Sequence, residues 1–191
     1  TQGDTIGRVA LGAAAGQTVV TDSTTVLLYK LIRGALSLRP GRTEIVVDRD
    51  NFPTDRYVVE SIAQDRGLTV VWIDSDPRGG VETEQLAAVV TDRTAVVVLS
   101  HVAYRSGFLL DAAAAARTAH EKGALLLLDL SHSVGSVPLH LDDWAVAGKT
   151  LEAAQRAFNY LVQLLQSLGF DINWSKSASP SQRVVFLGVL I

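Results

Sequence analysis

Residues 125–135 read LLLLDLSHSVG, a run of four leucines that ends on Asp129 and is followed three residues later by His132. A short, wholly apolar run predicts a strand buried on both faces, which is typical of a parallel sheet covered by helices. In an open α/β sheet, ligands bind beyond the carboxyl ends of the strands, so Asp129 is expected at the binding edge. A buried carboxylate there is unfavourable unless a cation or a hydrogen-bond donor meets it. The alternative is that Asp129 caps the turn that follows.

Short β-branched runs alternate with longer stretches of helical periodicity along the chain, and this alternation predicts βαβ units. Strands are expected at residues 18–21, 43–47, 68–73, 95–99 and 124–128. Helices are expected at residues 25–38, 53–66 and 111–122. The predicted fold class is α/β, with a parallel-type sheet that carries helices on both faces, followed by a helix-and-hairpin tail.

Composition restricts the classes of protein and partner. With 191 residues, of which 48% are hydrophobic, the chain can bury a sizeable core. Its 17 basic and 20 acidic residues balance closely, so no large field recruits a nucleic acid or an anionic membrane. The chain has no cysteine, which excludes disulfides and thiolate chemistry and favours the cytoplasm. No apolar run approaches the roughly 20 residues of a membrane span, so we expect no membrane partner.

Polar segments follow the other predicted strands. DSTT, residues 22–25, opens a helix and offers hydroxyls and free N–H groups that suit a phosphate, although the same pattern is an ordinary N-cap. NFPTD, residues 51–55, places Phe52 where its ring can lie over a flat ligand; alternatively it forms a hydrophobic staple with Thr54 or Asp55 as the cap. LSHVAYRSG, residues 99–107, gathers polar side chains in one loop: Ser100, His101, Tyr104 and Arg105.

In this order, the segments TDSTTV, NFPTDRY, LSHVAYRSG and DLSHSVGSVPLHLDDW resemble kynureninase over about residues 3–146. That family consists of pyridoxal phosphate (PLP) enzymes with the aspartate aminotransferase fold. The resemblance implies that Asp129 pairs with the pyridine nitrogen of PLP and that His132 lies beside its ring. It further implies that Phe52 stacks on the ring, and it assigns the phosphate to Thr24 and Thr25 and further cofactor contacts to Asp55 and Ser100.

The reaction that this resemblance implies is hydrolytic cleavage of the side chain of L-kynurenine to anthranilate and L-alanine. This is a step of tryptophan catabolism on the kynurenine pathway toward NAD biosynthesis, and the enzymes of the family are homodimers. The chain departs from the family where a Tyr-Lys-Tyr-Leu-Asn motif supplies the Schiff-base lysine. Without gaps, that position falls on Gln155, and neither Lys149 nor Lys176 occupies it. No catalytic residue is therefore assigned, and the chain is expected to be inactive.

Residues 151–191 are similar to part of a retroelement reverse transcriptase, through LQSLGFDINWSKS at 165–177 and FLGVLI at 186–191. The paired metal-binding aspartates of that family are missing. The residues themselves predict an amphipathic helix at 151–168 and two strands, around Ile172 and at 185–190. Trp174, Lys176 and Arg183 either contact a nucleic acid or belong to a solvated hairpin, which is the favoured interpretation.

The chain thus divides into a partial PLP-binding large domain, residues 1–146, and an unrelated tail, residues 147–191. Their junction near Ala147 suggests a fusion, a transposon insertion or an assembled sequence. Three functional hypotheses stay open: a kynureninase-type hydrolase by descent, a module that binds PLP without a covalent link, and a structural product. In the third, the tail helix covers an exposed sheet edge through Leu161, Leu164, Leu165 and Leu168.

Overall fold

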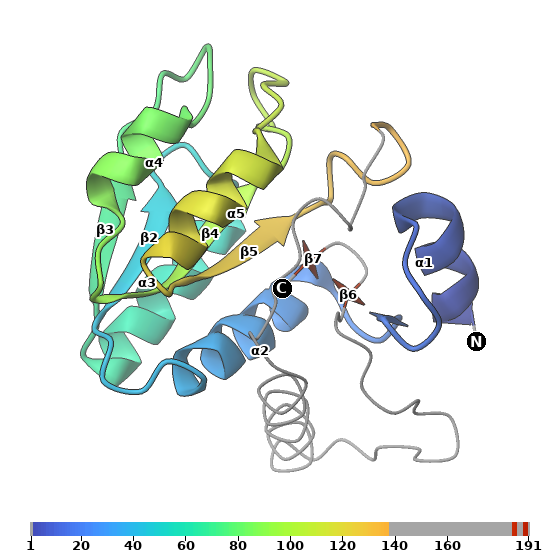
Figure 1. The fold of residues 1–191 in the computed structure, drawn as a ribbon, viewed down its shortest axis with the longest axis horizontal. Helices are drawn as coiled ribbons and strands as arrows, with labels where there is room; N and C mark the ends of the chain where they lie inside the picture. The colour runs from blue at the N-terminus through green and yellow to red at the C-terminus, as the bar shows by residue number, and fades with distance from the viewer. Residues whose placement is uncertain (1, 138–184, 187–188, 191) are drawn as a thin grey trace.

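The computed structural model describes residues 2–137, 185–186 and 189–190. They form one seven-stranded sheet with the order β1-β6-β7-β5-β4-β2-β3, covered by helices (Figure 1). The strands are β1 (Thr18–Val19), β2 (Glu44–Asp48), β3 (Thr69–Ile73), β4 (Thr94–Ser100), β5 (Leu125–Asp129), β6 (Val185–Phe186) and β7 (Val189–Leu190). The helices are α1 (Gln2–Leu11), α2 (Thr24–Ser37), α3 (Pro53–Arg66), α4 (Thr83–Val89) and α5 (Ala112–Glu121).

Strands β5, β4, β2 and β3 pair in parallel, as predicted. In the remaining part of the sheet, β7 runs antiparallel to both β5 and β6. The prediction of a parallel-type sheet is confirmed for β5, β4, β2 and β3, and the antiparallel strands β6 and β7 belong to the tail. Since β6 is in turn parallel to β1, the two reversals cancel, and β1 points the same way as β5. The helix that follows β1 consequently begins at the same edge of the sheet at which β5 ends.

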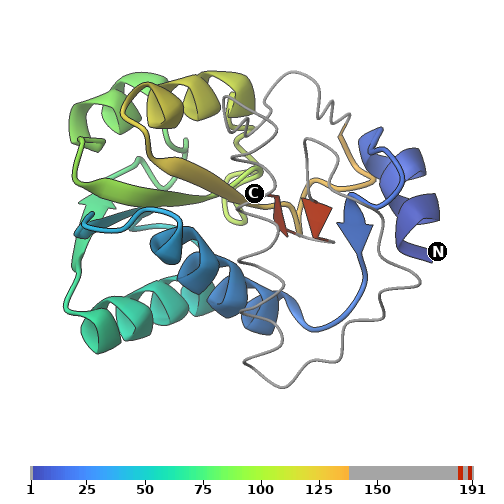
Figure 2. The same ribbon diagram turned by 60° about the horizontal axis from the view of Figure 1, so that its bottom comes forward.

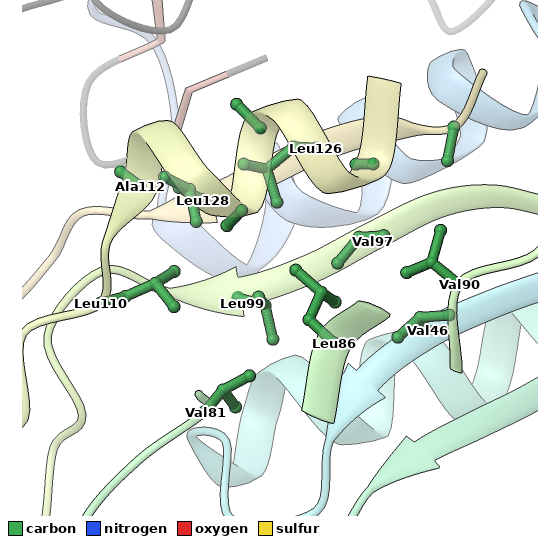
Figure 3. Packing of buried hydrophobic residues seen from close by; sticks show 14 of the residues in the cluster. Val46, Val81, Leu86, Val90, Val97, Leu99, Leu110, Ala112, Leu126 and Leu128 are labelled. Carbon is green, nitrogen blue, oxygen red and sulfur yellow. The ribbon is translucent and has the colours of Figure 1, made fainter. Parts of the chain in front are cut away.

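Consecutive residues of the central strands point to opposite faces, and each face is apolar. In β5, Leu125 and Leu127 pack with α2 and α3, whereas Leu126 and Leu128 pack with α4 and α5. The sheet seen nearly edge-on in Figure 2 lies between these two pairs of helices. Figure 3 shows the cluster on the α4 and α5 side, where Leu86 of α4 meets side chains of β2, β4 and β5. Two-sided burial is why the strand sequences show no polar alternation.

Helix α4 is attached to this cluster chiefly by Leu86, the one buried residue of the helix, which is 0% exposed. We expect Leu86→Ala to lower the free energy of unfolding by about 2–4 kcal/mol, because the truncation leaves a cavity where α4 packs on the sheet. Urea denaturation measures the change. Glu84→Ala, on the exposed side of the same helix, is the control and should change stability by less than about 0.5 kcal/mol. Equal effects of the two substitutions would contradict this packing.

The helix boundaries predicted from the sequence agree closely with those of the structure. Helix α3 spans the predicted residues, and α2 and α5 differ by one residue at each end. The predicted strand at 18–21 is shorter, and α1 and α4 were not predicted. Helix α1 carries glycines, which are poor helix formers. A Cβ on its Gly7 would lie 1.9 Å from Thr18 Oγ1, so the glycine is what lets α1 approach β1.

Several predictions on the tail fall outside the described residues. These are the helix at 151–168 with its four leucines, the strand around Ile172, the junction near Ala147, and the side chains of Lys149, Gln155, Trp174, Lys176 and Arg183. The prediction of one strand at 185–190 is wrong, because the chain reverses there: β6 and β7 are separate strands that pair antiparallel with each other. None of the helices in the described ranges has the length and apolarity needed to cross a membrane.

Candidate functional site

The carboxyl ends of β2, β4 and β5 carry the polar residues of the candidate site. Ser100 ends β4 and Asp129 ends β5, and the two residues are paired in register on neighbouring strands. The backbone N–H of His101 donates to the carbonyl oxygen of Asp129 at 3.0 Å, which ties the two loops together beyond the strands. Burial lowers the pKa of His101, so its imidazole is neutral near pH 7.

Asp129 is only 3% exposed. Its Oδ1 accepts hydrogen bonds from the backbone N–H and the hydroxyl of Ser131, at 2.8 Å and 2.6 Å. One carboxylate oxygen therefore caps the turn after β5, which is the alternative interpretation of this residue. The cap does not use the other oxygen, so Asp129 can serve the turn and a ligand at the same time.

Asp55 faces Asp129 from the first turn of α3 and is 2% exposed. Burial, followed by the neighbouring Asp129 carboxylate, raises the pKa of Asp55 from 3.8 to about 8. The Asp55 carboxyl group therefore keeps its proton at neutral pH, beside Asp129. Asp55 Oδ2 is buried and has no hydrogen-bond partner among the described residues. The N-cap of α3 is Phe52, without a side-chain cap, so the alternative that Asp55 caps the helix is wrong.

Three rings contact one another in the loops that follow β2, β4 and β5. The ring of Phe52 lies 5.2 Å from that of Tyr104, in an edge-on arrangement at 78°. On another side it lies 5.9 Å from the ring of His132, tilted by 45°. Arg105 donates from Nε to the Tyr104 hydroxyl at 2.7 Å and lies 3.4 Å from Asp50. The loops after β2, β4 and β5 are therefore joined through their aromatic side chains.

Thr24 and Thr25 form the first turn of α2, at the edge of the sheet where β5 ends. Ser23 is the N-cap, and its side chain accepts from the N–H of Val26 at 3.5 Å, so the N-cap alternative holds for this residue. Near the same helix start, the buried ammonium group of Lys30 lies 3.4 Å from the carboxylate of Asp22.

The described contacts bring four of the predicted site residues into one group, with a fifth in register beside it. Phe52 contacts His132, Asp55 faces Asp129, and Ser100 lies opposite Asp129 on β4. The two threonines lie at the same sheet edge but on a separate helix, and no described contact links them to that group. Asn51, to which the sequence assigned no role, is buried and bonded to Ser100. In the sequence, only its position between the end of β2 and Phe52 could have marked Asn51 as a site residue.

The chemistry of this group suits a flat, cationic heterocycle. Two buried carboxyl groups, one of which carries a proton, can release that proton to solvent when a cation binds. The carboxylate then accepts a hydrogen bond from the positively charged N–H group. The neighbouring rings offer faces and edges for a planar ligand. The part of the chain that the structure describes contains no cluster of three or more His, Cys, Asp or Glu residues able to hold a metal ion.

Comparison with known sequences gives a family and close relatives for most of the chain. Residues 7–147 match the family Aminotransferase class-V. A kynureninase from Pseudomonas fluorescens is 39% identical over 137 residues, which are 69% of this chain and 31% of that protein. A kynureninase from Burkholderia pseudomallei (strain 1106a) is 39% identical over 138 residues, 69% of this chain and 32% of the relative. The chain thus spans about a third of the length of these relatives.

Solved structures show the same fold. A NifS-like protein matches with a TM-score of 0.67 at 17% identity, over 76% of this chain and 40% of that one. SspA in complex with cysteine matches with a TM-score of 0.66 at 17% identity, over 75% and 41%. A C-DES mutant with glycine covalently linked to the PLP cofactor gives 0.51 at 22% identity, over 63% and 33%. Identities this low establish a common fold and leave the reaction open.

These comparisons confirm the resemblance to kynureninase over the first part of the chain and the α/β fold class. The resemblance of the tail to a reverse transcriptase stays a prediction. The family match, at residues 7–147, covers every strand from β1 to β5 and all the predicted site residues. The chain belongs to the aminotransferase class-V family.

Proposed function

We propose that this chain binds PLP at the carboxyl edge of the sheet, as a kynureninase-like member of its family. The observation that carries the proposal is the pair of buried carboxyl groups, Asp55 and Asp129, which face each other where β5 ends. A protonated pyridine nitrogen supplies a positive charge and a further N–H donor to this pair, in addition to the N–H and hydroxyl of Ser131 that Asp129 Oδ1 accepts from. The residues present therefore fit the cofactor. The PLP-linked C-DES structure, with the same fold, supports this choice of ligand.

Each of the site residues has a role that follows from its position. Asp129 accepts a hydrogen bond from the protonated ring nitrogen, and the carboxyl group of Asp55 lies beside it. Phe52 contributes a face or an edge to the heterocycle, beside the imidazole of His132. The hydroxyls of Thr24 and Thr25, at the positive end of the α2 dipole, are suited to the phosphate. When bound, a PLP ring with a protonated nitrogen withdraws electrons from a substrate carbon.

The substrate and the reaction rest on the kynureninase relatives. We place this chain by descent among hydrolases of L-kynurenine. The homodimer that the resemblance implies, and the cytoplasmic location that the lack of cysteine favours, belong to the same proposal. Gln155 stands at the ungapped position of the family's lysine, and an amide cannot form the covalent link to PLP. We therefore propose that the chain holds PLP without a covalent bond and does not turn over kynurenine by itself.

An absorbance titration with PLP, followed by borohydride reduction and mass spectrometry, tests this function. We expect saturable binding below about 1 mM PLP and no labelled lysine. Pyridoxal, which has no phosphate, is the matched ligand and should bind more weakly, because it cannot use the start of α2. A label on Lys149 would restore the catalytic interpretation. No saturation would refute PLP binding and leave a structural product, whose sheet β6 and β7 complete.

A further inference from the structure

Asn51 occupies the turn between the end of β2 and the ring of Phe52, and it is 3% exposed. Its backbone N–H donates to the carbonyl oxygen of Asp48 at 3.1 Å, which fixes the turn. Its side-chain Oδ1 accepts two hydrogen bonds. One comes from the backbone N–H of Phe52 at 2.9 Å, and the other from the hydroxyl of Ser100 at 2.6 Å. A single amide oxygen thus joins the end of β2 to the end of β4.

The donor groups fix the direction of both hydrogen bonds. A backbone N–H can only donate, so the side-chain atom of Asn51 that faces Phe52 must be the oxygen. The same oxygen lies next to Ser100 Oγ, so the hydroxyl must donate its single hydrogen to Asn51. Toward any other group, Ser100 Oγ can then only accept. Asn51 therefore sets both the place of the Phe52 backbone and the direction of the Ser100 hydroxyl.

The amide nitrogen is the second polar group of the Asn51 side chain, which lies beside a cavity at the candidate site. Nδ2 is buried and has no hydrogen-bond partner among the described residues. Asn51 lines a cavity of about 20 Å³ together with Asp48, Ser100 and Tyr104. Such a volume has room for one water molecule, which can accept from Nδ2. The described hydrogen bonds therefore hold Asn51 through Oδ1, and Nδ2 gains a partner only if a water enters the cavity.

We propose that Asn51 is a positioning residue of the cofactor site. Through Oδ1 it places the Phe52 ring and makes Ser100 an acceptor toward the bound cofactor. This inference rests on the proposed function, because the ligand that Phe52 and Ser100 are positioned to meet is PLP. The loss of Ser100 should remove part of this role, because part of the effect of Asn51 passes through that hydroxyl and part through the Phe52 N–H.

A double-mutant cycle on the PLP dissociation constant tests the inference, with the induced circular dichroism of bound PLP as a second readout of ring orientation. We expect Asn51→Ala to weaken binding about tenfold and to reduce the induced signal. Adding Asn51→Ala to Ser100→Ala should weaken binding clearly less than adding it to the wild type. Additive effects, or an unchanged induced signal in Asn51→Ala, would overturn the inference.

Asn51→Asp is the conservative variant, because its carboxylate can accept from Phe52 and Ser100 as the amide does. We expect it to recover most of the affinity and of the induced signal. Losses equal to those of Asn51→Ala would show that the residue does not act through Oδ1, and would contradict the proposal.

A measurement without PLP distinguishes failure of the proposed PLP binding from failure of the positioning role of Asn51. Hydrogen exchange of the Phe52 amide should be at least about tenfold faster in Asn51→Ala than in the wild type or in Ser100→Ala, since only the first variant frees that N–H. If the wild-type chain binds no PLP, the proposed function fails and this exchange still decides whether Asn51 holds the loop. Equal exchange in the three proteins would overturn the positioning role.

Discussion

Asp129→Asn is expected to weaken PLP binding by about 30-fold or more, equivalent to about 2 kcal/mol. The amide keeps the size of the side chain, and its oxygen can still accept from the N–H and the hydroxyl of Ser131. What it loses is the negative charge that stabilises a protonated pyridine nitrogen. The change therefore removes the cofactor contact while it spares the turn after β5. Equilibrium titration by absorbance measures the two dissociation constants.

The control for this substitution is Asp92→Asn, which removes the same charge from an exposed position in the turn before β4. It should leave the dissociation constant within about twofold of the wild type, because an exposed charge contributes little at this range. Asp129→Ala, which also removes the turn cap, should abolish binding. Unchanged affinity in both Asp129 variants would mean that the cofactor binds elsewhere.

Asp55→Asn is expected to stabilise the chain without PLP, and to do so more strongly as the pH rises from 4 to 8. The pKa of Asp55 is raised from 3.8 to about 8 in the folded chain, so the folded state keeps a proton that the unfolded state loses in this range. Stability from this group is complete below pH 3.8 and is lost as the pH rises to about 8. An asparagine resembles the protonated acid at every pH and escapes that loss. The difference between variant and wild type should grow by up to about 1.4 kcal/mol per pH unit.

Urea denaturation at a series of pH values measures this difference. Asp48, whose pKa burial also raises, is present in both proteins and drops out of the comparison. Asp92→Asn serves again as the control and should give a flat difference over the same range. A flat or falling difference for Asp55→Asn would show that Asp55 is ionised in the folded chain.

The strands and the site loops could be predicted because their signals are local. The leucines of β5 end abruptly at Asp129, and each polar segment of the site follows an apolar run. The sequence predicts a strand at 185–190, but its division into two antiparallel strands could not be predicted. Strands β6 and β7 have two residues each, and they pair with β1 and β5 from far along the chain. Segments so short carry no periodicity, and only the tertiary pairing defines them.

Within the site, the contact between Asp55 and Asp129 was also beyond a local prediction. An aspartate in the first turn of a helix commonly serves the helix dipole, and nothing in NFPTD distinguishes Asp55 from that ordinary use. The packing of α3 on the sheet turns its side chain inward. Asp129 and Ser23 show the opposite case. Here both of the interpretations that the sequence left open are compatible with the structure, because capping a turn or a helix uses only part of each segment.

The most direct test of the central claim is ¹⁵N NMR of PLP labelled at its ring nitrogen and bound to this chain. The chemical shift of that nitrogen reports whether it carries a proton. We predict a protonated nitrogen in the wild-type complex at pH 8 and an unprotonated one in Asp129→Asn, at PLP concentrations that saturate both proteins. An unprotonated nitrogen in the wild-type complex would contradict the contact between Asp129 and the cofactor.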